Sequence, residues 1–199
     1  MISEEIDHEY FDKKQLKEAI KNKIFTYIDD KEDGSELLLY DFLTPDRIQL
    51  DVDVRDWKDA IIQVGTPLIE RGEITKDYIT TVIANIEENG PYVVISKGFA
   101  FPHAQLGDYN KKTSMYMIRL KNPIYFDKEH DSPEDIGTQP VRYVCMLSVA
   151  DKNKHLKAVF NLFNLLKEDS FKKALDACQT SEEIYSLIEN EEKMLELRR

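Results

Sequence analysis

The N-terminal part of the chain shows a helical pattern followed by a charged segment. Within residues 13–28, apolar side chains recur at every fourth position, and Asp12 is placed to cap the helix that they predict. Residues 29–35 are mostly charged and end in Gly-Ser, a composition typical of a linker. We therefore expect residues 1–36 to form a helix and an acidic linker, and residues 37–199 to form the main domain.

Two amphipathic helices are predicted in the first half of the main domain. The first carries apolar residues on one face over residues 57–68 and is terminated by Gly72, while Pro67 should kink or shorten it. The second has its inner face within residues 79–86. It begins after Thr75, whose hydroxyl can cap the helix.

Strand-like patterns fall into two regions of the main domain. After a short helix that stops near Pro45, residues 48–52 alternate between apolar and polar, as a half-buried strand does. Further along, the apolar residues come in short runs, and a charged loop containing Pro and Gly spans residues 127–139. These runs predict four more strands, at residues 92–95, 99–101, 114–120 and 141–149.

Helices return at the C-terminal end. A short helix over residues 169–177 and a last helix opened by a Thr180–Glu183 capping box are expected, and the charged tail 189–199 is expected to fray. Helices before, between and after the strands predict an α/β fold, a mixed β-sheet flanked by helices on both faces. The helix that directly follows residue 151 has an apolar face made of Leu156, Val159, Phe160, Phe163 and Leu166.

Composition and charge exclude several classes of function. The net charge of −11 argues against nucleic-acid binding, which relies on a basic surface, and is compatible with solubility or with basic protein partners. No apolar run approaches the roughly 20 residues of a membrane span, and the N-terminus lacks a secretory signal. We therefore expect a soluble, cytoplasmic protein. Cys145 and Cys178 lack metal-ligand spacing, and Cys145 is expected to be buried.

His103 stands out among the residues that could carry chemistry. The chain has no phosphate-binding loop, zinc-protease, hydrolase or paired-cysteine motif, and His8 and His130 lie in charged segments typical of a surface. His103 follows a short apolar strand and Pro102, which fixes the backbone and keeps Phe101 extended. An imidazole is neutral and nucleophilic near pH 7, so His103 could attack a phosphoryl group. The alternative is a histidine that simply caps the strand end.

His155 is the second candidate. It opens an amphipathic helix directly after a strand, and the free N–H groups of a helix N-terminus suit an anion or a phosphoryl oxygen. The alternative is a half-exposed histidine in the first helical turn. Two histidines are too few to ligate a metal, so neither a metal nor another cofactor is expected.

One segment carries a specific resemblance, residues 90–104 with the sequence GPYVVISKGFAFPHA. It resembles the active-site segment of the type-2 EIIA domains of the bacterial phosphoenolpyruvate-dependent sugar phosphotransferase system, in the fructose/mannitol class. Residues 89–92 are similar to the ascorbate-like branch of that family. The resemblance covers roughly residues 38–190, with similar stretches at residues 43–52, 140–144, 155–156 and 181–185.

This resemblance implies a function and a fold. In the family, the histidine of the Pro-His motif, here His103, accepts a phosphoryl group from phospho-HPr. It then passes the group to an EIIB component, which serves a membrane EIIC permease. The histidine before the second-half helix, here His155, would lie beside His103 and assist phosphate binding. The implied protein is a phosphotransferase component with a mixed sheet flanked by helices, without direct contact to nucleic acid or membrane, and with a homodimer as one option.

Two departures and an alternative function accompany the resemblance. Mannitol-like members carry an arginine where this chain has Glu87, and ascorbate-like members often carry one where it has Gln105, so the sugar is left open. EIIA domains also occur at the C-terminal end of transcription regulators and antiterminators, and residues 1–36 would suit such a junction. A phosphorylation-sensing domain is therefore the alternative, and a domain that keeps the fold without phosphotransfer is a third reading.

Overall fold

The computed structural model describes residues 37–127, 136–150 and 156–197. The chain divides into two units, residues 1–34 and 35–199, and every described residue belongs to the second. The helix and linker predicted within residues 1–36 lie outside the described residues, as does His155. The domain boundary expected at residues 36/37 therefore stays a prediction.

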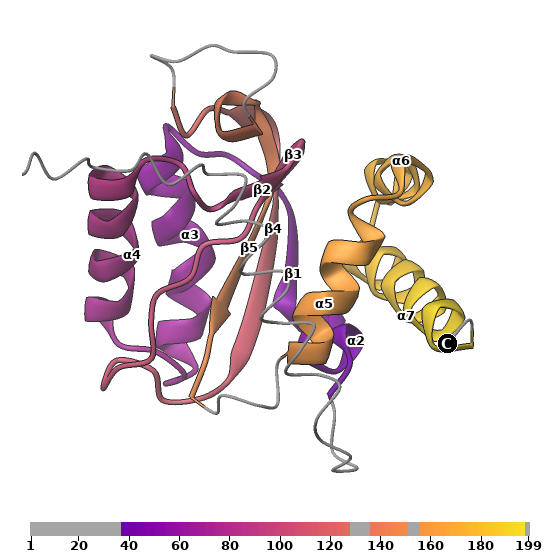
Figure 1. Ribbon diagram of the computed structural model, residues 1–199, viewed down its shortest axis with the longest axis horizontal. Coiled ribbons are helices and arrows are strands. Elements are labelled where there is room, and N and C mark those ends of the chain that lie inside the picture. The colour runs from indigo at the N-terminus through magenta and orange to yellow at the C-terminus, as the bar shows by residue number, and fades with distance from the viewer. Residues whose placement is uncertain (1–36, 128–135, 151–155, 198–199) are drawn as a thin grey trace, which may run out of the picture. The chain divides into compact units, whose positions relative to one another are not determined.

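A five-stranded mixed sheet forms the centre of the domain, in the order β1-β4-β5-β3-β2 (Figure 1). β3 runs parallel to β5, with Ala100 opposite Val144, and β4 runs antiparallel to β5, with Ser114 opposite Ser148. The C-terminal ends of β3 and β5 and the start of β4 therefore meet at one edge of the sheet. All five predicted strands are confirmed: β1 (Ile48–Val52), β2 (Val94–Ser96), β3 (Gly98–Ala100), β4 (Ser114–Ile124) and β5 (Val141–Ser148).

Helices cover both faces of this sheet, as predicted (Figure 1). One face carries α3 (Trp57–Glu70) and α4 (Lys76–Asn89), whose buried residues share a core with the sheet. A second core lies on the other face, where the remaining helices pack. These are α2 (Leu39–Phe42), α5 (Leu156–Leu165), α6 (Asp169–Ala177) and α7 (Ser181–Leu197), with short 3-10 turns η1 (Pro45–Arg47) and η2 (Ile136–Thr138) beside the strands.

In the first half, Pro67 does not shorten α3 and the Thr75 side chain does not cap α4. α3 continues through Pro67 to Glu70 because Leu68, in its last turn, is fully buried in the core and holds the helix in place. Thr75 does precede α4, but its buried hydroxyl has no hydrogen-bond partner among the described residues. The backbone carbonyl of Thr75 accepts the Tyr78 N–H at 3.1 Å instead.

The C-terminal helices also differ from the prediction. α7 does not fray at residue 189, because Glu192 is fully buried and its carboxylate accepts hydrogen bonds from the Leu39 and Tyr40 N–H groups at 2.7 and 3.1 Å. The predicted apolar face of α5 is confirmed at Val159 and Leu166, whereas Phe160 and Phe163 are only partly buried. Its buried apolar residues are Ala158, Val159, Leu162 and Leu165, followed by Leu166 beyond the helix end.

Candidate functional site

His103 lies just beyond the end of β3, on a segment fixed from both sides. The Phe101 N–H donates to the Val93 carbonyl at 2.7 Å, and the Leu147 N–H donates to the Pro102 carbonyl at 3.1 Å. Phe101 and Pro102 are buried, and proline has no N–H that would need a partner here. The backbone that presents His103 is therefore tied to the strand on each side of it.

The imidazole of His103 is held in one orientation by its own backbone. Its Nδ1 lies 2.8 Å from the Phe101 carbonyl oxygen, and because a carbonyl can only accept, Nδ1 donates the hydrogen. The ring also contacts two aromatic rings, Tyr92 edge-on at 5.7 Å and Phe101 at 6.1 Å between centroids. Nε2 has no hydrogen-bond partner among the described residues, so it is the nitrogen available for reaction.

Burial sets the protonation of His103. Desolvation lowers the pKa of its imidazole below 6.5, and the hydrogen bond to the Phe101 carbonyl opposes this effect only in part. Near pH 7 the ring is therefore neutral, with a proton on Nδ1 and a lone pair on Nε2. His103 is intermediate between buried and exposed, so part of the residue is open to solvent. This arrangement fits a nucleophile that needs no separate base.

A buried tyrosine hydroxyl supports the residue after His103. Tyr78 is fully buried in the first turn of α4; its hydroxyl donates to the Leu147 carbonyl and accepts the Ala104 N–H at 3.1 Å. Desolvation raises the pKa of Tyr78, so the hydroxyl keeps its proton. One side chain thus joins the end of β5 to the loop that carries His103.

Tyr92, which is partly buried, holds the same segment. Its hydroxyl donates to the His103 carbonyl at 3.1 Å, while its ring packs edge-on against the imidazole. Burial raises the pKa of Tyr92, so this donor also stays protonated near neutral pH. The Tyr92 hydroxyl therefore holds the backbone of His103, and the Tyr92 ring holds the imidazole.

The loop after His103 is folded back onto the sheet by Asn110. The amide of this residue accepts the Gly107 N–H at 3.0 Å and donates to the Ser148 hydroxyl at 3.0 Å. The Tyr109 carbonyl accepts the Thr75 N–H at 3.1 Å, which links the loop to the start of α4. Leu106, near the tip of the loop, is 48% exposed.

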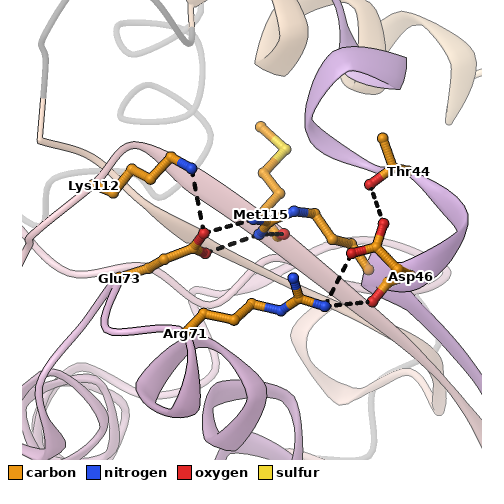
Figure 2. Close-up of polar contacts among 7 residues, drawn as sticks. Thr44, Asp46, Arg71, Glu73, Lys112 and Met115 are labelled. Atoms are coloured by element: carbon orange, nitrogen blue, oxygen red, sulfur yellow. Dashed lines mark hydrogen bonds and ion pairs between the residues drawn. The ribbon is translucent and has the colours of Figure 1, made fainter.

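An ion-pair network lies where the loop returns to β4 (Figure 2). Arg47 donates to both carboxylate oxygens of Glu73, at 2.5 and 2.8 Å, and to the Met115 carbonyl at 3.3 Å. Burial pushes the pKa of Glu73 upward, but the hydrogen bonds and charge of Arg47 outweigh it, so the pKa is lowered. Lys112 lies 3.5 Å from the same carboxylate. The network fastens the start of β4 to the segments before β1 and after α3.

Of the two predicted site residues, only His103 lies among the described residues. His155 lies outside the described residues, so its position beside His103 stays a prediction. Glu87 is half exposed and pairs with Lys58, and Gln105 is exposed next to Ala104. Neither is a hydrogen-bond partner of His103.

Sequence reasoning missed Tyr78 and Tyr92 as supports of the site. Tyr78 is four residues before Val82 and eight before Ile86, so the helical period of α4 places it on the buried face. Tyr92 falls within a predicted strand, although β2 begins only at Val94. A buried tyrosine needs a partner for its hydroxyl, which is the signal that could have drawn attention to Tyr78.

Metal binding and membrane crossing find no support in the part of the chain that the structure describes. These residues contain no group of three or more His, Cys, Asp or Glu side chains that could hold a metal ion. None of the helices among them has both the length and the apolar character that crossing a membrane requires.

Comparison with known proteins connects this geometry to one family. Residues 41–191 match the family model described as "Phosphoenolpyruvate-dependent sugar phosphotransferase system, EIIA 2". The chain is 28% identical over 154 residues to the ascorbate-specific PTS system EIIA component of Shigella flexneri, covering 76% of this chain and 95% of that protein.

Solved structures show the same fold. A putative PTS IIA domain from Streptococcus pyogenes superposes with a TM-score of 0.65 at 26% identity, over 78% of this chain and 96% of that one. The IIA mannitol protein of Escherichia coli, in its complex with phosphorylated IIB, gives a TM-score of 0.61 at 21% identity, over 74% and 97%. The family model spans most of the domain, including the whole segment around His103. This chain therefore belongs to the EIIA type-2 family of the phosphoenolpyruvate-dependent sugar phosphotransferase system.

Proposed function

We propose that this protein is a phosphocarrier that accepts a phosphoryl group on Nε2 of His103. The donor is phospho-HPr, and the acceptor is an EIIB component that serves a membrane EIIC permease. The observation that carries the proposal is the imidazole itself. Its Nδ1 is committed to the Phe101 carbonyl at 2.8 Å, its pKa is lowered by burial, and its Nε2 is unpaired among the described residues.

The proposed step needs little covalent machinery. The Nε2 lone pair attacks phosphorus, an N–P bond forms, and the bond between phosphorus and the donor's leaving atom breaks. Because Nδ1 already carries the only ring proton, no proton has to leave Nε2 before attack. Positioning of the two reacting groups and stabilisation of the phosphoryl oxygens then provide most of the catalysis.

Rigidity around His103 supports such a role. The hydroxyls of Tyr78 and Tyr92 and the N–H of Leu147 together fix residues 102–104. We assign His155 to a hydrogen bond with a phosphoryl oxygen, since it directly precedes α5 in the sequence.

The relatives support the carrier over the phosphorylation-sensing alternative. The Shigella protein matched over 95% of its length is named as an EIIA component, and the Escherichia coli mannitol IIA protein was solved in a complex with phosphorylated IIB. An EIIB-type protein is therefore the acceptor we propose for this chain.

A reconstituted relay tests the proposal. The full chain is incubated with enzyme I, HPr and labelled phosphoenolpyruvate, and His103→Ala is compared with His130→Ala as a matched histidine control. We expect acid-labile label on the wild type and the His130→Ala protein, none on the His103→Ala protein, and chase of the label onto an added EIIB. Labelling of the His103→Ala protein to the wild-type level would refute the assignment.

A further inference from the structure

We propose that the domain contains a second anion-binding site, at the opposite end of β3 from His103, which takes a free phosphate-sized dianion. The site is a cavity of about 80 Å³ between the start of β3, the start of β5 and the helix α6. A cavity needs only roughly 10–15 Å³ to hold one water molecule. This cavity therefore has room for a group several times larger, such as a phosphate ion. The inference does not depend on phosphotransfer at His103.

Three cationic side chains from three different elements line this cavity. Lys97 comes from the turn between β2 and β3, Arg142 from β5, and Lys172 from the first turn of α6. Only one carboxylate, that of Asp176, is among the lining residues. In a chain with a net charge of −11, composition alone does not explain three cations around one small cavity.

The available carboxylates leave these cations incompletely paired. Asp176 accepts the Tyr143 hydroxyl at 2.8 Å and lies 3.6 Å from Nε of Arg142. Lys172 pairs at 2.9 Å with Asp169, which is not one of the lining residues. Lys97 has no hydrogen bond or ion pair to a described residue and is exposed. An anion between the three would find positive charge on several sides.

Arg142 provides an independent sign of a missing ligand. Its Nε is buried and makes no hydrogen bond to a described residue, because the Asp176 carboxylate with which it forms an ion pair lies 3.6 Å away. A buried donor without a partner is costly and uncommon, and an ion or water in the neighbouring cavity is an ordinary explanation. Guanidinium groups bind phosphate through two parallel hydrogen bonds, which suits a tetrahedral anion better than a halide.

The apolar wall of the cavity favours a small, doubly charged ligand. Phe99, Leu166 and Leu175 are buried and line one side. They lower the local dielectric constant and so strengthen the attraction between an anion and the three cations. Gly98, with a φ of +82°, allows the tight turn that brings Lys97 to the rim. The ligand class is therefore inorganic phosphate or the phosphate group of a small free monoester.

A phosphate titration of the full chain, followed by ¹H–¹⁵N NMR at constant ionic strength, tests this site. We expect saturable shifts of the backbone amides of Gly98, Phe99 and Tyr143 and of the Arg142 Nε–H signal. Arg142→Gln should weaken binding at least about tenfold, since it removes a charged two-point donor. Lys97→Gln is the second variant, because Lys97 makes no hydrogen bond or ion pair with the described residues that its loss would break.

The controls separate this site from general charge effects and from His103. Lys172→Gln should weaken phosphate binding, because Lys172 lines the cavity. Lys173 is exposed on α6 and does not line the cavity, so Lys173→Gln makes the same change in net charge but should leave binding unchanged. Equal weakening by both variants, or shifts confined to residues around His103, would overturn the proposal. Glycerol 3-phosphate serves as a second ligand: tighter binding than inorganic phosphate assigns a phosphate monoester, and weaker binding assigns the free ion.

Discussion

At the scale of single residues, the reactivity proposed for His103 depends on one hydrogen bond and on its burial. The Phe101 carbonyl holds the proton on Nδ1, and desolvation keeps the ring neutral. Both effects are present in the free protein, before a partner binds. They leave Nε2 as the nitrogen that we propose to react, and this selection needs no second side chain.

The first prediction concerns the titration of His103. Its pKa should lie below 6.5, and the neutral ring should carry its proton on Nδ1, as seen in the ring ¹⁵N shifts across a pH series. Because the unfolded chain takes up this proton first, His103 should contribute stability above pH 6.5 that is lost as the pH falls toward the folded-state pKa. A pKa above 6.5, or a proton on Nε2, would contradict this picture.

The second prediction concerns the Tyr78 hydroxyl. Tyr78→Phe leaves the Leu147 carbonyl and the Ala104 N–H without this partner, so the free energy of unfolding should fall by about 1–3 kcal/mol. Phosphoryl acceptance should slow severalfold, because Ala104 follows His103 directly. Denaturant unfolding and the initial rate of labelling measure the two effects.

Tyr109→Phe is the matched control for that experiment. The Tyr109 ring packs edge-on against Tyr78 at 5.5 Å, and no hydrogen bond of its hydroxyl to a described residue is seen. It should therefore keep both stability and rate. Equal losses in the two variants would show that the effect is not specific to the hydroxyl bridge of Tyr78.

At the scale of elements, the two ends of the folded domain are fastened by Glu192 of α7. Its carboxylate accepts the N–H groups of Leu39 and Tyr40 and the side-chain amide of Asn161, the last at 2.7 Å. Burial raises the pKa of Glu192, and the hydrogen bonds from these donors oppose that rise. α7 is therefore joined to the beginning of α2 through a fully buried polar contact.

The third prediction tests that connection by comparing adjacent positions. Glu192→Ala leaves three donors without their acceptor and should lower the free energy of unfolding by about 2 kcal/mol or more. Glu191→Ala, at an exposed position of the same helix, should change it by less than about 0.5 kcal/mol. Urea unfolding curves measure both. Similar values for the two variants would contradict the role of Glu192.

Local sequence patterns predicted the helices and strands well, because the repeat of apolar residues that marks each of them involves only residues close together in the chain. All five strands and the α6 boundaries were predicted, and the Pro-His step at the end of β3 pointed to His103. Predictions failed where distant contacts decide the outcome: Leu68 holds the end of α3 beyond Pro67, and Glu192 stabilises the charged tail. Tyr78 was missed for the same reason, since its partners lie 26 and 69 residues away.

At the scale of the whole molecule, the order of the strands brings the site together. β3 and β5 are parallel neighbours, so residues 101–104 and the end of β5 leave the sheet at one edge. The loop after His103 then crosses this edge before β4 begins, with Leu106 exposed on it. We therefore expect a partner that reaches Nε2 to contact this loop as well.

The fourth prediction follows from that position. Leu106→Asp should slow phosphoryl transfer from phospho-HPr at least about fivefold while leaving the unfolding free energy unchanged, because a charge replaces an exposed apolar side chain on the loop that follows His103. Leu197→Asp, at a residue that is 81% exposed at the end of α7, is the control and should transfer at the wild-type rate. An unchanged transfer rate in the Leu106→Asp protein would show that the loop is not part of the docking surface.

The measurement that tests the central claim most directly is the identity of the phosphorylated nitrogen. The ¹⁵N-labelled full chain is phosphorylated through enzyme I and HPr, and the histidine ring resonances are recorded at neutral pH. The hydrogen bond from Nδ1 to the Phe101 carbonyl predicts that phosphorus is attached to Nε2 of His103 and to no other residue. Phosphorus on Nδ1, or on any other side chain, would contradict the account.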